Sequence, residues 1–342
     1  MQRGETNGQA SGVRCQVSGV MDLPSQNSIF TIATGSHVYL RYAFNLARSF
    51  ALHNEIEKTS FYIVTDQQCV LPEGLSFVRL TALPSEVAAR GVTPKLYLDR
   101  LAPTERSLFL DADCLVFRDL QSVFDRFRGR PTSVVGVAVS DGTWCGPEAA
   151  TLCAQFGIAA MPRFNGGLYY VEPGAAATKV YDTARQLRSQ FDALGFHRHR
   201  GSVADEPLVS LGMAIHSQEP IADDGSILSD LGAGLQYTKI DVLHGKSVLY
   251  NPPPPSPRHK WWQSTRGAYS PAIIHFTDGF PYDREVFKLS LKSTRSFPDN
   301  AVGAVAFCRY TAPYWSENFL KSLGRPIYRK LFGYRPVKAG RR

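Results

Sequence analysis

Short apolar segments alternate with helical patterns along the first third of the chain. Between the first two segments, apolar residues from Leu40 to Ala51 recur at the spacing of one helix face. Helical crossovers of this kind are typical of parallel sheets. We therefore expect an α/β fold, with a Rossmann-like, mostly parallel central sheet flanked by helices on both faces. The segments expected to be strands are SIFTIA, FYIVT, SFVRL and SLFL, at 28–33, 61–65, 76–80 and 107–110.

The second half of the chain is less regular. Helices are expected after Pro173 and near Ala204. The segment 251–262 has too many prolines for a helix or a central strand and is expected to be a loop. Further strands are expected at 134–139, 168–171 and 272–276.

The domain organisation follows from these patterns. The first residues are rich in Gly, Ser, Gln and Asn and have few apolar positions. No repeat or linker interrupts the rest of the chain. We therefore predict a flexible polar leader at 1–27, a single domain at 28–290, and a basic C-terminal helical extension at 291–342.

Composition restricts the class of protein. Of the 342 residues, 44% are hydrophobic and 11% aromatic, which is too much apolar material for a disordered chain. No apolar run approaches the roughly 20 residues of a membrane-spanning helix, and the first residues lack the apolar core of a secretory signal. The six cysteines are scattered without a CxxC pair, as is typical of reduced thiols. We therefore expect a cytoplasmic protein.

The net charge of +8 is concentrated at the C-terminus. Without the residues that follow Glu317, basic and acidic residues number 30 each, so the body of the chain is formally neutral. Apolar residues lie among the terminal basic ones, and we expect two short helical pieces broken at Gly324 and Pro326. The eight basic residues after Glu317 are Lys321, Arg325, Arg329, Lys330, Arg335, Lys338, Arg341 and Arg342.

Basic residues interleaved with apolar ones favour an anionic membrane surface over nucleic acid. We therefore predict that residues 318–342 tether the protein to the inner face of a membrane, and we expect no nucleic-acid partner. The alternative is a terminal helix that docks on the domain and keeps its charges solvated.

Two carboxylates follow the fourth predicted strand. Asp111 and Asp113 are separated by one residue, so on an extended chain their side chains point the same way. In open parallel sheets, ligands bind where the strands end. Converging carboxylate oxygens suit Mg²⁺ or Mn²⁺, which would in turn neutralise a diphosphate. The alternative is a turn in which one aspartate caps the next segment.

Three other segments carry groups suited to binding or catalysis. His275 ends the strand AIIHF; such a histidine is more often packed in a core, but beside two carboxylates it would favour Mn²⁺. Asn165-Gly166-Gly167 allows a ligand to approach the backbone closely, although Asn-Gly is also a common turn. Asp205 and Glu206 begin a helix, where they either complement its dipole or lie beside a reacting sugar.

Well-known nucleotide and hydrolase motifs are missing. The segment His244-Gly245-Lys246-Ser247 ends like a phosphate-binding P-loop, but Ile240 stands where the first glycine is needed. No GxGxxG, GxSxG or HExxH motif occurs. P-loop ATPases and classical dinucleotide dehydrogenases are therefore disfavoured.

Six segments occur in an order that closely resembles one enzyme family. The order resembles that of the retaining GT-A glycosyltransferases of the group containing glycogenin and bacterial lipopolysaccharide galactosyltransferases, which is glycosyltransferase family 8-like. The resemblance spans roughly 28–290 and is most specific between Thr93 and Phe117. The segments are ATGSHVYLRYAFNLARSF, TPKLYLDRL, SLFLDADCLVF, FNGGLYYVEP, ADEPLVSLGM and IHFTDGFPY.

The resemblance implies a set of site residues. It makes Asp111, Asp113 and His275 the metal ligands and Lys95 a group that approaches the donor sugar and phosphates. It also implies that Asn165, Asp205 and Glu206 line the donor sugar and the reacting centre. The nucleotide and donor site would include Ala33, Thr34, Tyr39, Ala112, Gly166, Gly167 and Gly279, with Tyr39 able to stack on uracil.

The chain departs from the family pattern at three places. The family commonly has an acidic residue after the first strand to bind uracil, where this chain has Gly35-Ser36. The lysine that grips the diphosphate is missing from Gly279-Phe280-Pro281-Tyr282, and Arg258, Lys260 or Arg284 would have to replace it. Glu206 stands where the family often has glutamine. The carboxylate of Glu206 would act either as a nucleophile or as a group that orients sugar hydroxyls.

The resemblance implies a metal-dependent enzyme that moves a sugar from a nucleotide-diphosphate sugar, with UDP the expected nucleotide, to an acceptor hydroxyl with retention. We expect a glycan or lipid-linked acceptor, for which Trp261-Trp262 would form a stacking platform or merely pack the loop. One alternative is a nucleotidyltransferase acting on sugar phosphates. Another is a non-catalytic surface-binding protein with a degenerate transferase domain.

Overall fold

The computed structural model describes residues 25–88, 94–199, 201–233, 239–260, 263–276, 279–294 and 297–333. Three predicted features lie wholly or partly outside these ranges: residues 1–24 of the leader, the Trp261-Trp262 pair and residues 334–342 of the tether.

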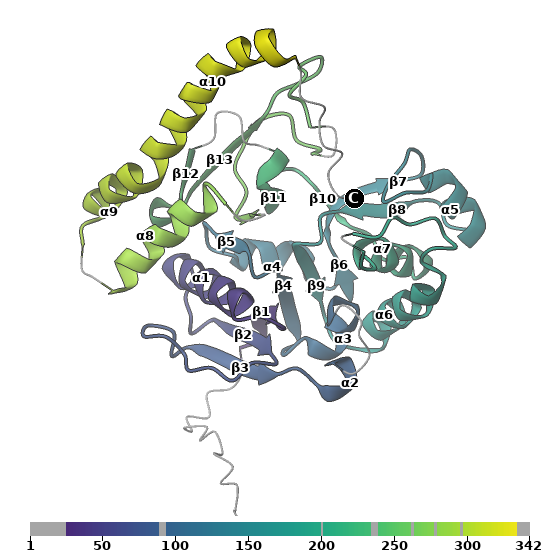
Figure 1. The fold of residues 1–342 in the computed structure, drawn as a ribbon. Coiled ribbons are helices and arrows are strands. Elements are labelled where there is room, and N and C mark those ends of the chain that lie inside the picture. Colours follow the sequence, from purple (N-terminus) through teal and green to yellow (C-terminus); the bar gives the residue numbers. More distant parts are fainter. Residues whose placement is uncertain are drawn as a thin grey trace, which may run out of the picture.

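A six-stranded sheet forms the centre of the molecule (Figure 1). Its strand order is β3-β2-β1-β4-β9-β6, and the neighbours from β3 to β4 are parallel. Only β9 runs against its neighbours in this sheet. The prediction of a mostly parallel central sheet is therefore confirmed. The strands are β1 (Asn27–Ala33), β2 (Thr59–Thr65), β3 (Val78–Ala82), β4 (Arg106–Leu110), β6 (Thr132–Ser133) and β9 (Leu168–Val171).

The third strand begins two residues later than its apolar sequence predicted. The Val78 amide donates to the Leu75 carbonyl oxygen at 3.0 Å, so the chain is still turning at Ser76 and Phe77. Local turn geometry thus overrides an apolar run that has the composition of a strand.

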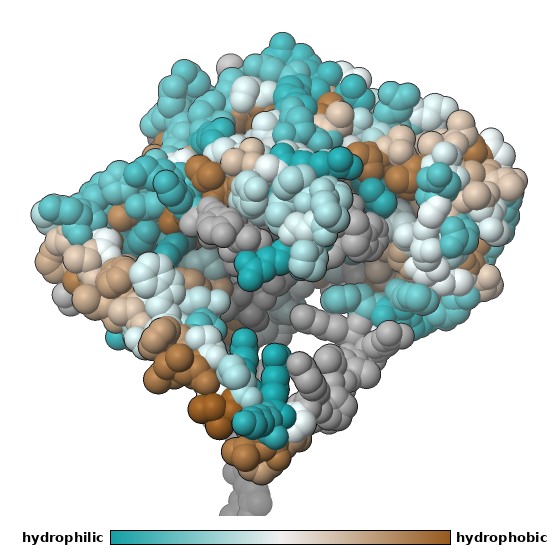
Figure 2. Space-filling view, turned by 90° about the horizontal axis from the view of Figure 1, so that it is seen from above, coloured by the Kyte–Doolittle hydropathy of each residue, from teal (hydrophilic) through white to brown (hydrophobic). Residues whose placement is uncertain are grey.

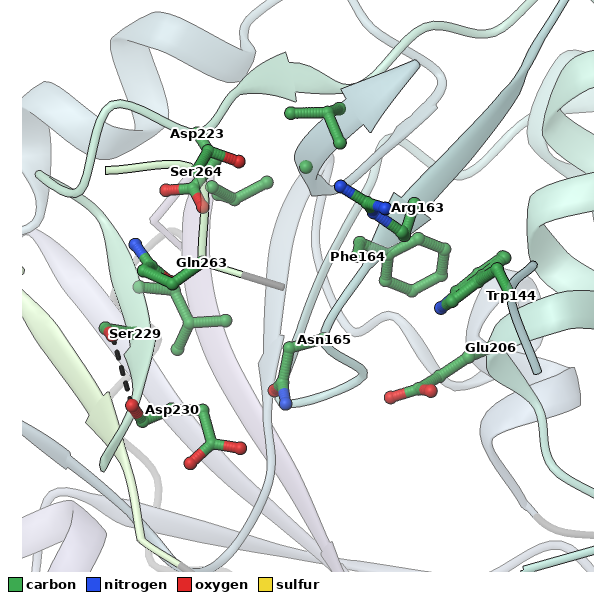
Figure 3. Close-up of a pocket in the computed structure, with 14 residues that line it drawn as sticks. Trp144, Arg163, Phe164, Asn165, Glu206, Asp223, Ser229, Asp230, Gln263 and Ser264 are labelled. Atoms are coloured by element: carbon green, nitrogen blue, oxygen red, sulfur yellow. Dashed lines mark hydrogen bonds between the residues drawn. The ribbon is translucent and has the colours of Figure 1, made fainter. Parts of the chain in front are cut away.

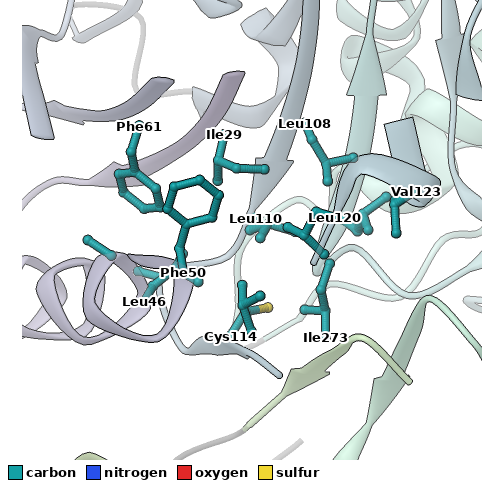
Figure 4. Close-up of a cluster of buried hydrophobic side chains, with 14 of the residues drawn as sticks. Ile29, Leu46, Phe50, Phe61, Leu108, Leu110, Cys114, Leu120, Val123 and Ile273 are labelled. Atoms are coloured by element: carbon teal, nitrogen blue, oxygen red, sulfur yellow. The ribbon is translucent and has the colours of Figure 1, made fainter. Parts of the chain in front are cut away.

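Helices cover both faces of the central sheet because β1 alternates its apolar side chains between them (Figure 1). Ile29 packs toward α1, where Phe50 and Phe61 lie 5.4 Å apart by ring centroid (Figure 4). Phe30 belongs to the opposite cluster, which the other helices cover. These helical elements are α1 (His37–His53) on the first face, and η1 (Pro94–Tyr97), α3 (Leu98–Leu101), α6 (Ala175–Leu187) and α7 (Glu206–Ile215) on the second.

Three small sheets extend the core on the side where the central strands end. Their orders are β10-β7-β8, β11-β15-β5 and β12-β13-β14. In the second of these, β15 pairs antiparallel with β5, which places His275 opposite Cys114. The strands are β5 (Cys114–Val116), β7 (Val135–Val139), β8 (Met161–Phe164), β10 (Ile221–Ala222), β11 (Leu228–Asp230), β12 (Lys239–Asp241), β13 (Lys246–Asn251), β14 (Gly267–Tyr269) and β15 (Ile273–His275).

Six short helical elements also lie between these strands, before the C-terminal part. They are α2 (Ser85–Ala88), α4 (Gln121–Phe127), α5 (Ala149–Phe156), η2 (Arg188–Gln190), η3 (Leu231–Ala233) and η4 (Val242–His244).

The C-terminal part is helical, as expected. The helix α8 (Tyr282–Thr294) packs on the body through the fully buried Glu285, whose carboxylate accepts from the Val242 amide at 2.8 Å. The predicted boundary at residue 290 falls inside this helix. After α8 come α9 (Asp299–Ala306), a π-helical turn (Phe307–Thr311) and α10 (Ala312–Phe332).

The expectation of two helical pieces broken at Gly324 and Pro326 is wrong, because α10 is continuous from Ala312 to Phe332. A proline inside a helix removes one hydrogen bond and costs about 3 kcal/mol, but the turns on either side can continue past it. None of the residues of α10 is buried, and in Figure 1 the helix projects from the body. Within the described parts of the chain, no helix has the length and apolar character needed to cross a membrane.

Candidate active site

The turn between β4 and β5 brings Asp111 and Asp113 to the end of the central sheet. The Asp111 amide donates to the Gly167 carbonyl oxygen at 3.0 Å, and the Cys114 amide donates to the Asp111 carbonyl oxygen at 2.9 Å. Cys114 then pairs with His275 across the small sheet. The sheet register therefore joins the aspartate motif to a histidine that lies far away in the sequence.

Asp111, Asp113 and His275 form a cluster with the geometry of a metal site. His275 Nε2 lies 3.1 Å from Asp113 Oδ1 and 3.7 Å from Asp111 Oδ2. One candidate ligand atom from each of the three residues lies within 4.8 Å of the other two. Two carboxylate oxygens and an imidazole nitrogen are a donor set that suits a divalent cation.

Asn165 fixes the orientation of the His275 ring. Asn165 Oδ1 accepts the Gly167 amide at 2.9 Å, so this atom is an acceptor, and His275 Nδ1 donates to it at 2.8 Å. Nε2 is then the ring nitrogen that faces the two aspartates. Burial lowers the pKa of His275, but the hydrogen bond that its protonated ring donates to Asp113 and the charges of both aspartates outweigh burial and raise it.

Lys95 lies on the other side of Asp111. Its Nζ is 2.7 Å from Oδ1 and 2.8 Å from Oδ2 of Asp111, and it donates to the Gly166 carbonyl oxygen at 3.0 Å. Burial lowers the pKa of Lys95, but the carboxylates of Asp111, Asp205 and Glu206 outweigh burial, so the pKa is raised and the ammonium stays charged.

Arg185 holds the short helix that carries Lys95. Its guanidinium donates to the Leu96 carbonyl oxygen at 2.7 Å and to the buried Asp99 carboxylate at 2.8 Å and 3.1 Å. This contact comes from α6 and was not anticipated from the sequence, because it joins residues about 90 positions apart.

Glu206 is the first residue of α7, and Asp205 precedes it as the N-cap. Glu206 Oε1 accepts the Gly166 amide at 2.6 Å, and Asp205 accepts from the Tyr169 hydroxyl. Burial and the neighbouring Asp205 charge raise the pKa of Glu206 to about 7. Burial, together with the charges of Asp205 and Glu206, also raises the pKa of the Tyr169 hydroxyl, so Tyr169 remains a donor to Asp205.

The two adjacent glycines fit closely between these side chains. A Cβ on Gly166 would lie 2.8 Å from Glu206 Oε1, and a Cβ on Gly167 would lie 2.8 Å from His275 Nδ1. Only glycine fits both positions without moving the groups around them.

A small cavity adjoins the aspartates on the β1 side. Its volume is about 190 Å³, and Tyr39, Tyr42 and Ile32 line it together with the 111–113 turn. Tyr39 is 50% exposed, so its ring can receive a ligand. Ala33 is fully buried in the core, which leaves only its backbone for binding, while Thr34 is partly exposed. Gly279 lies beyond the undescribed residues 277–278 and has a φ of +75°.

Asp66 was missed by sequence reasoning. The Gly35 amide lies 3.0 Å from both of its carboxylate oxygens. Because β1 and β2 are parallel and pair Ala33 with Thr65, the residues that follow the two strands lie side by side. An acidic group thus lies beside Gly35, although it comes from the neighbouring strand. The register of the two apolar runs was the signal that could have found it.

Of the three cations considered for the diphosphate, Arg284 is engaged elsewhere. Its Nε donates to Glu285 Oε1 at 2.6 Å and its Nη2 donates to the Ile240 carbonyl oxygen at 2.9 Å. It therefore ties α8 to β12. Arg258 and Lys260 lie in the loop after β13, where the Lys260 amide donates to Asn251 Oδ1 at 2.9 Å.

Comparison with known proteins gives a structural likeness only. No protein-family model matches the sequence, and no curated protein matches it. A structure of the galactosyltransferase LgtC with donor and acceptor sugar analogues aligns with a TM-score of 0.52 and 14% identity, covering 81% of this chain and 99% of LgtC. An active-site mutant of LgtC aligns with a TM-score of 0.51 and 13% identity, covering 80% and 98%. The chain has the GT-A fold.

Within this GT-A fold, a second cavity of about 270 Å³ is lined by Asn165 and Glu206, which accept the amides of Gly167 and Gly166 beside the metal-site cluster (Figure 3). It lies where the sheets of β7 and β11 face each other. Sequence reasoning had selected only those two of its residues. The remaining lining residues are Val135, Gly136, Val137, Trp144, Arg163, Phe164, Asp223, Leu228, Ser229, Asp230, Gln263 and Ser264.

Proposed function

We propose that this chain is a metal-dependent, retaining glycosyltransferase that moves a sugar from a nucleotide-diphosphate sugar, a UDP-sugar, to an acceptor hydroxyl. The carrying observation is the Asp111–Asp113–His275 cluster, joined to Lys95 and Asn165 at the end of the central sheet. The GT-A fold shared with LgtC, a galactosyltransferase that binds donor and acceptor analogues, supports this function.

Asp111, Asp113 and His275 would hold Mn²⁺ or Mg²⁺, with Mn²⁺ favoured by the imidazole ligand. When bound, such a cation supplies Lewis-acid stabilisation of the negative charge that develops on a leaving diphosphate. Lys95 adds a fixed positive charge beside Asp111, and it stays protonated because three carboxylates surround it.

The nucleotide would bind in the cavity at Tyr39 and Thr34, with Ala33, Ala112 and Gly279 contributing backbone. The exposed ring of Tyr39 suits stacking on a base. The backbone of Gly166 and Gly167 would border the donor sugar, and the closeness of Glu206 and His275 to these glycines explains why no side chain is present there.

The transfer itself exchanges one bond for another. The acceptor oxygen bonds to the anomeric carbon, the bond from that carbon to the diphosphate oxygen breaks, and its electron pair leaves with the diphosphate. The acceptor proton ends on the released diphosphate or in solvent. Asn165, Asp205 and Glu206 would orient sugar hydroxyls around this carbon, because Asn165 and Glu206 accept the amides of Gly167 and Gly166 and Asp205 precedes Glu206.

We propose residues 28–290 as the catalytic domain and 291–342 as an extension, after a leader at 1–27. The exposed helix α10 supports a membrane role for this extension. Six of its apolar side chains lie on one face of an ideal helix, opposite Lys321, Arg325 and Arg329, whereas Lys330 falls on the apolar face and Phe332 on the basic one. We propose that it holds the protein on the cytoplasmic face of an anionic membrane, near a glycan or lipid-linked acceptor. The apolar residues are Trp315, Phe319, Leu320, Leu323, Ile327 and Leu331, each 55–68% exposed.

The direct test is nucleotide release from a panel of UDP-sugars with Mn²⁺, with Mg²⁺ and with a chelator. We expect at least one UDP-sugar to be consumed only when metal is present. Asp113→Ala should abolish this reaction, whereas Asp125→Asn, on the exposed face of α4, should not change it. Full activity of Asp113→Ala, or consumption of nucleoside triphosphates in place of UDP-sugars, would contradict the proposal.

A further inference from the structure

The larger cavity beside Asn165 and Glu206 has an unusual balance of charge. Three carboxylates line it, from Glu206 on α7, Asp223 after β10 and Asp230 at the end of β11. Arg163 is the only basic residue among its described lining residues. In Figure 3 these groups surround the space from opposite sides. A ligand with a phosphate or carboxylate of its own would therefore meet like charges at short range.

The same cavity contains a buried hydrogen-bond donor that has no partner within the described parts of the chain. Gln263 lines the cavity and is 7% exposed, and no described residue accepts from its Nε2. A buried amide without a partner costs free energy, so such groups are almost always satisfied in native proteins. Because Nε2 itself is buried, a ligand oxygen in this cavity would provide the missing acceptor once the Gln263 amide turns toward it.

Aromatic side chains form another part of the wall. The rings of Trp144 and Phe164 lie 5.9 Å apart by centroid, and both line the cavity. Flat apolar faces beside a few polar groups are typical of small-ligand pockets. Sugar rings have both kinds of surface, since their C–H faces are apolar and their edges carry hydroxyls.

We propose that this cavity binds an uncharged sugar ring of the acceptor, a substrate class that deepens the proposed function and rests on it. The ring hydroxyls donate to Asp223 and Asp230 and accept from Gln263, while one ring face packs on Trp144. The reacting hydroxyl lies toward Asn165 and Glu206, which the cavity shares with the donor-sugar site. Acceptors with a phosphate or carboxylate on this ring are rejected by the carboxylates.

The test measures UDP release with Mn²⁺ and a UDP-hexose, in the presence of methyl glycosides of neutral hexoses, of the corresponding uronic acids and of the hexose 6-phosphates. We expect neutral glycosides to raise the rate above the acceptor-free rate, and the charged ones to have at least tenfold lower kcat/KM. Asp223→Asn and Gln263→Leu should each raise the KM for the neutral glycoside about tenfold, with a smaller change in kcat. Asp223→Asn should also reduce the difference in kcat/KM between neutral and charged acceptors.

Asp125→Asn serves as the matched control because it changes an exposed carboxylate on α4. Circular dichroism verifies folding, and Asp230→Asn replaces Asp223→Asn if the latter does not fold. Charged glycosides that are accepted as well as neutral ones, or an unchanged acceptor KM in folded variants, would overturn the proposal. If the enzyme hydrolyses the donor but no neutral glycoside raises the rate, this inference alone is overturned. If no UDP is released under any condition, the proposed function itself is overturned.

Discussion

Asn165 Oδ1 lies 2.8 Å from His275 Nδ1, although the two residues are 110 positions apart in the sequence. The Gly167 amide donates to the same atom at 2.9 Å, which identifies this end of the Asn165 amide as the oxygen, an acceptor. Asn165 therefore determines which nitrogen of His275 faces the aspartates.

Replacing Asn165 with alanine should weaken Mn²⁺ binding. Without the amide oxygen, the His275 ring loses the partner that fixes its orientation, and losses of this kind typically cost about 10–100-fold in metal affinity. Isothermal titration with Mn²⁺ measures the effect. Asn318→Ala on the exposed α10 is the control, and a wild-type Mn²⁺ affinity in Asn165→Ala would contradict the assignment.

Adding a methyl group at Gly167 should weaken metal binding and sugar transfer, whereas adding one at Gly303 should not. The new Cβ would lie 2.8 Å from His275 Nδ1, so the ring must move away from the aspartates. We expect Gly167→Ala to lower Mn²⁺ affinity and sugar transfer at least about tenfold, since outer contacts of ligating groups have effects of this size. Gly303→Ala on α9 meets open space and should instead raise the free energy of unfolding by up to about 1 kcal/mol.

Neutralising Lys95 should reduce turnover. Lys95→Met removes the charge that contacts both oxygens of Asp111, and loss of a fixed charge beside a developing negative charge typically costs about 10²–10³ in kcat. Steady-state UDP release measures this, with Lys58→Met as the control because Lys58 pairs with Glu55 on the surface. An unchanged kcat in Lys95→Met would show that its charge acts on neither phosphate nor sugar.

Glu206 should make stability depend on pH. Its pKa rises from 4.5 to about 7 on folding, because burial disfavours the carboxylate. A folded-state pKa above the unfolded value means that the wild type loses stability as pH rises from about 4.5 to 7, and the loss then stays constant. Glu206→Gln cannot ionise at this position and does not lose stability in this way. The Tm of the variant relative to that of the wild type should therefore increase from pH 4.5 to 7. Parallel Tm curves for the two proteins would contradict the shifted pKa.

The helix α10 should bind anionic vesicles. Full-length protein should sediment with vesicles containing phosphatidylserine and should be released by salt, because exposed apolar and basic side chains act together at such surfaces. Removal of residues 318–342, or the double change Leu323→Ser and Ile327→Ser, should abolish sedimentation. Equal sedimentation of the full-length and shortened proteins would refute the membrane role.

Much of the central fold could be predicted from the sequence because its strands are buried on both faces. Such strands are continuous apolar runs, and β1, β2 and β4 were found within two residues of their ends. The start of β3 at Val78 and the continuity of α10 through Pro326 were not, since each depends on hydrogen bonds that a residue-by-residue pattern does not contain.

The site was predictable only where its geometry is local. Asp111 and Asp113 are separated by one residue on an extended segment, so their convergence follows from strand geometry. His275 reaches them through the pairing of β15 with β5, and the sequence pointed to it only through family resemblance. Asp66 depends on the register of β1 and β2, while Gln263 lies in irregular chain without a periodic pattern.

The pairing of β15 with β5 also determines when the cluster can form during synthesis. Both aspartates leave the ribosome more than 150 residues before His275, as their numbers show. A nascent chain that has not yet added β15 beside β5 has two of the three residues of the cluster and lacks the imidazole. High-affinity capture of a divalent cation would thus report that the last strand of this small sheet has docked, which links loading of the ion to completion of the fold.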